Sequence, residues 1–288
     1  MSAVGDQGHQ PAARSYLYVP ASSPELIDKA LAGRADAVVL DLEDAVPPDR
    51  KVAARANAAA VLRAPPPKAL YVRVNGLASG LMLDDLAAVA SPHLAGVRVP
   101  KAEDGDGIRT VRARLDAAGC NAVVVPIIES ALGVERAFDI ASAHPSVATL
   151  AMGEADLRAD LHATADDALD FARSRCVLAA RAARRLPAIQ SVHTQLGDEA
   201  GLRASTERGR ALGFGARSAV HPAQVPVIND VLSPSEAERE RAAAIVSAYR
   251  MALAQGLAVT TLDDGQFIDE PVARDAADVL ARAALPRD

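Results

Sequence analysis

Eight apolar, β-branched segments alternate with helix-like segments between residues 14 and 228, and a polar or charged residue follows nearly every one of them. Neither a GxGxxG turn nor a Walker loop follows any of these segments, which argues against an open nucleotide-binding sheet. Continuous apolar strands that alternate with helices are typical of parallel strands buried on both faces. The sequence therefore predicts an α/β fold, a TIM (β/α)8 barrel, with its chemistry at the carboxyl ends of the strands.

The expected elements follow in order along the chain. Strands begin near residues 16, 36, 69, 96, 121, 147, 188 and 218. Helices are expected over 24–31, 50–62, 84–89, 108–118, 134–141, 169–186 and 199–212. Ser23 before Pro24 is a typical helix start, with serine at the N-cap and proline at the first helical position.

The chain is expected to have three parts. Residues 1–13 are expected to form a flexible tail, and residues 14–228 the barrel with its metal site. Residues 229–288 are expected to form a C-terminal extension or lid. This extension is too short to be an independent domain, so it should pack on the barrel or on a neighbouring subunit.

Within the extension, residues 234–255 predict a helix with Ser233 as N-cap and Glu236 at the third helical position, a capping box. A hairpin should turn at Asp264–Gly265, and a last helix should cover 271–284.

The composition limits the possible classes of function. The chain has 288 residues, 50% of them hydrophobic, and a formal net charge of −6, which argues against nucleic acid and anionic membranes as partners. No apolar run approaches the ~20 residues of a membrane span. Cys120 and Cys176 lack CxxC spacing, so neither zinc nor a disulfide framework is indicated. Unpaired cysteines and the lack of a signal pattern predict a cytoplasmic protein.

Two acids that follow neighbouring strands are the candidate metal ligands. Glu129 ends the apolar run 122–128, and Asp156 comes shortly after the run 147–152. Mg²⁺ typically takes one or two protein carboxylates and keeps its other positions for water and substrate. The alternative is that Glu129 caps the next helix and Asp156 is a turn residue, because acids are common at helix N-termini. Polar residues after nearly every strand favour the metal site.

The other strand ends carry further candidates. They are Glu43 and Asp44 after the second strand, Arg73 and Asn75 at the third, Lys101 after the fourth and His221 after the eighth. An arginine offers a bidentate fork to a carboxylate, although Arg73 could instead pair with Glu43 or Asp44. These two acids either hold water molecules of a metal or cap the next helix. We expect His221 to be structural.

Seven motifs resemble those of one known family. They are RSYLYVPASSPE, ADAVVLDLEDAVPPDRK, YVRVNG, GVRVPKAED, PIIESALGV, AMGEADLRADL and GFGARSAVHPAQVPVIN. Together they resemble the citrate lyase β-subunit-like branch of the HpcH/HpaI aldolase superfamily, which includes malyl-CoA and citramalyl-CoA lyases. The resemblance implies a TIM barrel, usually a homotrimer, that binds Mg²⁺ and cleaves or forms a carbon–carbon bond next to a carbonyl.

The resemblance also implies roles for individual residues. The family's metal-binding Glu and Asp fall on Glu129 and Asp156, and its carboxylate-binding Arg falls on Arg73. The acids of its LEDAV motif fall on Glu43 and Asp44.

The Asp of the family's C-terminal ID motif falls on Asp269. In malyl-CoA lyase-like members this Asp lies on a lid that reaches the active site of a neighbouring subunit. Asp269 is then a candidate general acid/base, with the N-cap before Pro271 as the alternative role.

CoA phosphates require basic partners, and the candidates are Arg14, Lys101 and Arg217. Arg217 stands where the family often has Lys, Gln190 where many members have Asp, and His162 where many have Gly. An amine is not equivalent to a guanidinium, so we expect these departures to affect substrate detail more than the metal site.

The predicted activity is that of a Mg²⁺-dependent carbon–carbon lyase acting on a 3-hydroxyacyl-CoA such as malyl-CoA or citramalyl-CoA. Its products, or its substrates in the reverse direction, would be acetyl-CoA and a 2-oxo acid. One alternative is a citrate lyase β-type subunit that receives its acyl group on a carrier protein. Another is a metal-independent aldolase with Lys101 as Schiff-base nucleophile, although a salt-bridged lysine is also expected there. A third keeps the metal site and ends in thioester hydrolysis or condensation.

Overall fold

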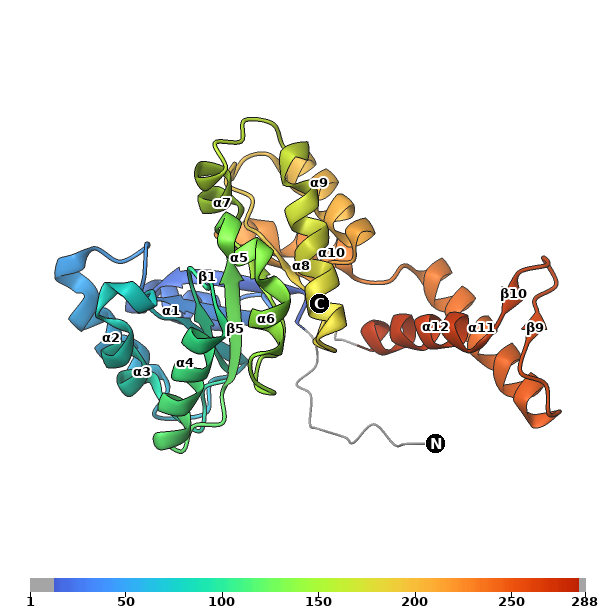
Figure 1. The fold of residues 1–288 in the computed structure, drawn as a ribbon, viewed down its shortest axis with the longest axis horizontal. Coiled ribbons are helices and arrows are strands. Elements are labelled where there is room, and N and C mark those ends of the chain that lie inside the picture. The colour runs from blue at the N-terminus through green and yellow to red at the C-terminus, as the bar shows by residue number, and fades with distance from the viewer. Residues whose placement is uncertain (1–12, 285–288) are drawn as a thin grey trace. The chain divides into compact units, whose positions relative to one another are not determined.

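The computed structural model describes residues 13–284, and its main feature is a closed barrel of eight parallel strands (Figure 1). The strands follow one another around the barrel in chain order, and the last pairs with the first. They are β1 (Ser15–Pro20), β2 (Ala37–Asp41), β3 (Ala69–Arg73), β4 (Gly96–Val99), β5 (Val123–Ile128), β6 (Ala151–Met152), β7 (Ile189–Gln190) and β8 (Ala216–Ala219). The predicted TIM barrel is confirmed. The expected tail, apart from Ala13, lies outside the described residues.

The helices α1 to α9 connect the strands on the outside of the barrel, and α10 follows the last strand (Figure 1). They are α1 (Pro24–Ala32), α2 (Lys51–Val61), α3 (Met82–Val89), α4 (Gly105–Ala117), α5 (Ala131–Glu135), α6 (Ala137–Ser142), α7 (Glu154–Asp160), α8 (Asp170–Ala182), α9 (Glu199–Leu212) and α10 (Val225–Leu232). In α1, Ile27 and Ala30 are buried while the charged residues between them stay in water. This amphipathic pattern is what turns each helix towards the strands.

The alternation of side chains along each strand decides what fills the barrel. Tyr16, Val39, Tyr71 and Val125 belong to one buried interior cluster. Gly96 leaves room for the neighbouring ring, since a Cβ added there would lie 2.6 Å from a ring carbon of Tyr71. Successive side chains of a strand point to opposite faces, so the interior residues continue upward in steps of two to the carboxyl end.

Two elements of the barrel differ from those expected. Only Ala151–Met152 of the sixth expected strand pair as a strand, because its earlier part makes a single bridge between Val147 and Val124. The helix expected after Glu129 is broken at Arg136, which separates α5 from α6.

Residues 230–284 belong to a second compact unit. It contains the helix α11 (Glu236–Ala254), the antiparallel pair β9 (Thr260–Thr261) and β10 (Phe267–Ile268), and the helix α12 (Glu270–Ala283). The unit has a small core of its own around Ile245 and Ile268.

The capping box of α11 lies two residues beyond the expected one. Ser235 accepts a hydrogen bond from the amide of Glu238, and the Glu238 carboxylate accepts one from the amide of Ser235. Ser235 and Glu238 have the same S-x-x-E spacing as Ser233 and Glu236, so the motif alone does not choose between the two starts.

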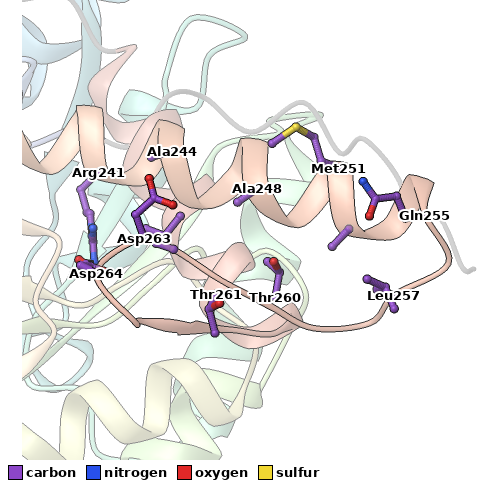
Figure 2. A pocket seen from close by; sticks show the side chains of 12 residues that line it. Arg241, Ala244, Ala248, Met251, Gln255, Leu257, Thr260, Thr261, Asp263 and Asp264 are labelled. Carbon is purple, nitrogen blue, oxygen red and sulfur yellow. Dashed lines mark ion pairs between the residues drawn. The ribbon is translucent and has the colours of Figure 1, made fainter.

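A pocket of about 570 Å³ lies between α11 and the β9–β10 hairpin (Figure 2). Arg241 closes one end by pairing with Asp264 at 2.5 Å, while Met251 and Leu257 line the other end. All of its lining residues belong to the C-terminal unit. No helix in residues 13–284 is both long and apolar enough to cross a membrane.

A network of charges ties α7 to α8 and α9. The buried Arg173 on α8 donates two hydrogen bonds to Glu154 at 2.7 and 3.0 Å, and it also pairs with Asp166 and Asp170. Arg208 of α9 contacts the same two aspartates. Hydrogen bonds from Arg173 hold the pKa of Asp166 down at about 2, against the opposing effect of its partial burial. This network fixes the start of α7, the helix that carries Asp156.

The network predicts a specific acid dependence of stability. The pKa of Asp166 is about 2 in the folded chain and near 3.8 in the unfolded chain, so its stabilising contribution is complete above about pH 4. That contribution is lost as the pH falls through the folded value. We expect Asp166→Asn to be less stable than the parent at pH 7 but to lose less stability between pH 4 and 2. Urea unfolding followed by circular dichroism measures both, and parallel curves for the two proteins would contradict the assignment.

Candidate active site

Six of the predicted site residues gather at the carboxyl end of the barrel: Glu43, Asp44, Arg73, Lys101, Glu129 and Asp156. They follow or end β2, β3, β4, β5 and β6, which are neighbours in the barrel. Glu129 comes directly after β5, and Asp156 lies in the first turn of α7. Glu43 and Glu129 are buried, whereas Asp44 and Asp156 are open to solvent.

Arg73 ends β3 and is surrounded by three acids. Its Nε and Nη2 donate to the two oxygens of Asp41 at 2.7 and 2.6 Å, and its Nη1 lies 3.0 Å from Glu43 and 3.3 Å from Asp44. The Glu43 contact is an ion pair without hydrogen-bond geometry. Burial opposes the charge of Arg73, but the hydrogen bonds and charge of Asp41 dominate and raise its pKa above the usual value. The pairs with Glu43 and Asp44 that were considered as the alternative role of Arg73 do form, and the closest partner is Asp41.

Lys101 joins the two buried glutamates. Its backbone amide donates to Glu129 Oε1 at 2.7 Å, and its ammonium donates to Glu43 Oε1, also at 2.7 Å. Its φ of 51° lies in the left-handed region that non-glycine residues rarely adopt. Burial alone would lower the pKa of Lys101, but the hydrogen bond and charge of Glu43 outweigh it and raise the pKa.

Glu129 is held closely on its second oxygen as well. A Cβ added to Gly153 would lie 2.3 Å from Glu129 Oε2, so only glycine leaves room for this carboxylate. The pKa of Glu129 is raised to about 7, and burial is the largest cause. The charges of Glu43 and Asp156 raise this pKa further, whereas the hydrogen bond from the amide of Lys101 lowers it.

A second group of polar residues supports the loop after β2. The ammonium of Lys51 donates to the carbonyls of Leu42 and Glu43 and to the side chain of Asn75, at 2.6 to 2.7 Å. Asn75 in turn donates to the fully buried Asp85. The backbone at Glu43 is therefore held by Lys51, and the side chain of Glu43 is held by Lys101.

The donor set suits a small, hard divalent cation. Glu129 and Asp156 are close enough for their charges to interact, and Glu129 Oε2 accepts no hydrogen bond within residues 13–284. No group of three or more His, Cys, Asp or Glu side chains in the described chain has a metal-binding arrangement. Two carboxylates with open positions for water and substrate match Mg²⁺ better than a metal that needs a full set of protein ligands.

Two basic residues predicted to bind CoA phosphates do not reach this end of the barrel. Arg14 lies before β1, at its amino end, and pairs with Asp36 at 2.8 Å. Arg217 is the second residue of β8 and points outward to α9, where it donates to Ser205 and Thr206 at 2.9 and 2.6 Å. Burial lowers the pKa of Arg217 to about 10. The two predicted substrate-binding residues therefore lie away from the cluster of acids, one at the opposite end of its strand and the other on the outer face of the barrel.

The departures from the family pattern lie away from the site for the same reason. Gln190 is paired in register with Arg217 and also points to α9, where it donates to the carbonyl of Ser205. His162 is exposed in the loop after α7, with a φ of 52°. The expectation that these positions affect substrate detail is therefore not supported by where they lie. His221 accepts a hydrogen bond from the amide of Ala223, a structural role.

Asp269 lies in the C-terminal unit and is the N-cap of α12. Its Oδ1 accepts a hydrogen bond from the amide of Val272 at 3.0 Å. The capping role considered from the sequence is thus present, and a catalytic role remains a proposal.

Sequence reasoning missed three residues of the barrel interior near the site: Asp41, Tyr18 and Arg98. Each lies inside a predicted strand and not after it. The alternation of side chains along a strand could have identified two of them. Asp41 is two residues before Glu43 and so faces the same side of the strand. Arg98 interrupts the apolar run of β4 on the same face as Gly96.

Comparisons with known proteins agree with this fold. The sequence matches the family described as HpcH/HpaI aldolase/citrate lyase over residues 14–222. A citrate lyase subunit beta-like protein of Deinococcus radiodurans is 38% identical, over 94% of this chain and 97% of its own. A (3S)-malyl-CoA thioesterase of Cereibacter sphaeroides is 35% identical, over 94% of both chains. The structure of CitE from Mycobacterium tuberculosis in complex with magnesium, acetoacetate and coenzyme A superposes with a TM-score of 0.79 at 30% identity, covering 95% of this chain and 99% of that one.

An eight-stranded barrel with acids and an arginine at its carboxyl end, together with these relatives, defines a lyase. The chain belongs to the HpcH/HpaI aldolase/citrate lyase family. Within that family it is a CitE-like lyase, and its relatives put its activity among the CoA-ester lyases in general.

The contact between Gly153 and Glu129 gives a direct test of the site. We expect Gly153→Ala to push the Glu129 carboxylate out of position and to weaken Mn²⁺ binding, measured by electron paramagnetic resonance, by at least about tenfold. Gly197→Ala is the matched control, because nothing lies within 4 Å of a Cβ there. Equal Mn²⁺ affinity in both variants would show that Glu129 does not depend on this contact.

Proposed function

We propose that the chain is a Mg²⁺-dependent carbon–carbon lyase that cleaves or forms a 3-hydroxyacyl-CoA such as malyl-CoA or citramalyl-CoA. The observation that carries the proposal is the cluster of Glu129, Asp156 and Arg73 at one end of the barrel, with Lys101 linking Glu43 to Glu129. The magnesium, acetoacetate and coenzyme A of the related CitE structure support the same combination of metal ion, oxo acid and coenzyme A.

The proposed reaction breaks the bond between the hydroxyl-bearing carbon and the α-carbon of the thioester. The hydroxyl group loses its proton and becomes the carbonyl of the 2-oxo acid. The departing α-carbon keeps the bonding electrons as an enolate, which takes up a proton to give acetyl-CoA. The residues must therefore bind an acid, accept one proton and supply another.

Arg73 is proposed to bind the carboxylate of the 2-oxo acid half. Its Nε and Nη2 are fixed by Asp41, which orients the planar guanidinium and leaves donors for a ligand. Glu129 and Asp156 would hold Mg²⁺, which when bound polarises the carbonyl of the acid. Glu43 and Asp44 face the same opening and are proposed to orient water around that site.

Asp269 is proposed to act as the general acid/base towards the enolate carbon. We further propose that the C-terminal unit, residues 229–288, is a lid that carries Asp269 to an active site, as in a trimer where each lid serves a neighbouring subunit. The barrel with its metal site would then be residues 14–228. The buried free thiols of Cys120 and Cys176 support a cytoplasmic, reducing location.

A Schiff-base mechanism through Lys101 is less consistent with the site. A nucleophilic lysine must lose its proton, whereas the hydrogen bond and charge of Glu43 raise the pKa of Lys101 in spite of partial burial. The ammonium is also engaged by Glu43 at 2.7 Å. Thioester hydrolysis is the stronger second candidate, because a 35% identical relative is named a (3S)-malyl-CoA thioesterase.

The first experiment measures acetyl-CoA and glyoxylate or pyruvate release from malyl-CoA and citramalyl-CoA, with Mg²⁺ and then with EDTA. We expect metal-dependent release of both products, and a loss of roughly 100-fold or more in Glu129→Gln because a carboxamide is a weaker ligand. Release of free CoA with malate would assign the thioesterase reaction instead. Activity that survives EDTA, and is trapped by borohydride, would move the assignment to Lys101.

The role of Asp269 can be separated from its role as a helix cap. Asp269→Ser keeps an N-cap oxygen, so we expect the thermal unfolding midpoint of the C-terminal unit to change little. The same substitution removes the carboxylate, so we expect at least a tenfold lower kcat with little change in the affinity for Mg²⁺. An unchanged kcat would leave Asp269 as a cap alone.

A further inference from the structure

Arg98 is a buried charge in the interior of the barrel. It has no exposed surface, and no carboxylate within residues 13–284 pairs with it. Its Nη1 donates to the hydroxyls of Tyr18 and Ser218, both at 2.9 Å, while Nε and Nη2 have no partner in the described chain. An arginine buried without an acid is costly, so its retention needs a reason beyond packing.

Tyr18 contacts both this arginine and the proposed substrate-binding arginine. The guanidinium carbon of Arg98 is 5.1 Å from the centre of the Tyr18 ring, and that of Arg73 is 5.2 Å from it. Tyr18 is on the interior face of β1, level with Val39, which is two residues below Asp41 on the neighbouring strand. The phenol therefore lies just below Arg73, in the floor of the site.

The bond from Arg98 fixes how the Tyr18 hydroxyl can be used. The hydroxyl oxygen accepts from Arg98, and its proton is donated to no acceptor in residues 13–284. A phenol hydroxyl has one proton to donate. Because the Tyr18 oxygen already accepts a hydrogen bond from Arg98, this proton points away from Arg98. Ser218, the other partner of Arg98, is buried, whereas Tyr18 is only partly buried and is the one that a ligand can reach.

We propose that Tyr18 is a substrate-binding residue whose hydroxyl donates a hydrogen bond to the carboxylate of the 2-oxo acid held by Arg73. Arg98 is the positioning residue that makes this hydroxyl a donor. The inference rests on the proposed function, since it takes a 2-oxo acid as the ligand of Arg73.

The experiment uses the full chain and pyruvate as the probe, with Mg²⁺ present and binding measured by isothermal titration calorimetry. Tyr18→Phe removes the hydroxyl and keeps the ring next to both arginines. Tyr16→Phe is the matched control, because Tyr16 is on the same strand, faces the same interior and lies 4.5 Å from Arg98, but is buried one layer lower. Both variants lose one barrel hydroxyl, so a general loss of packing should affect them alike.

We expect Tyr18→Phe to weaken pyruvate binding by about 10-fold to 100-fold, and Tyr16→Phe to leave it within about threefold. The KM for pyruvate in the condensation direction should rise with it, while Mn²⁺ affinity stays unchanged. Arg98→Met should weaken pyruvate binding in the parent but much less in the Tyr18→Phe background, because the two residues act through one hydroxyl.

Three results would overturn the proposal. Pyruvate affinity of Tyr18→Phe equal to that of the parent would exclude the hydrogen bond, and so would equal losses in the two tyrosine variants. Additive effects of Arg98→Met and Tyr18→Phe would exclude the positioning role of Arg98. A parent protein that binds neither pyruvate nor glyoxylate with Mg²⁺ would refute the proposed function itself, a result distinct from failure of the tyrosine variant alone.

Discussion

The carboxylates at the mouth of the barrel depend on one residue in a strained conformation. Lys101 has a left-handed backbone, which costs a non-glycine residue about 1–2 kcal/mol, and this conformation lets its amide reach Glu129 while its ammonium reaches Glu43. In a residue with β-region dihedral angles, the backbone amide and the side chain would point in different directions. The strain is therefore offset by two charge-assisted hydrogen bonds, which are among the stronger bonds in proteins. The spacing between the two glutamates follows from this single turn of the chain after β4.

The alternation of side chains along each strand determines which residues face the interior at each level of the barrel. Side chains that face inward at the level of Val39 and Tyr71 are apolar or aromatic, and two residues further on the same faces carry Asp41 and Arg73. The register between neighbouring strands sets these residues side by side, which is why Asp41 is the closest partner of Arg73. One alternation thus makes the lower barrel a packed core and the upper barrel a charged site.

The same alternation explains how far the sequence could be read. Eight apolar runs predict the barrel, and acids after neighbouring runs predict that Glu129 and Asp156 share one opening, because both follow from order along the chain. Whether a residue within a strand faces inward depends on the register, which composition does not reveal. Arg217 is one residue from the inward-facing Ser218, and that single step sends it to α9. Arg14 precedes its strand, so it lies at the amino end, which its position before Ser15 already indicated.

Asp269 brings a helix cap and a proposed reactive group together in one side chain. Its Oδ1 accepts the amide of Val272, which satisfies a backbone donor at the start of α12 and leaves Oδ2 outside the cap. A carboxylate on a free loop would sample many directions, whereas one bound to a helix start keeps a fixed orientation on a rigid element. The cap also places it at the positive end of the helix dipole, where a negative charge is stabilised. The structural and the proposed chemical roles of Asp269 are therefore compatible, because the hydrogen bond from Val272 that caps the helix would also fix the orientation of the carboxylate.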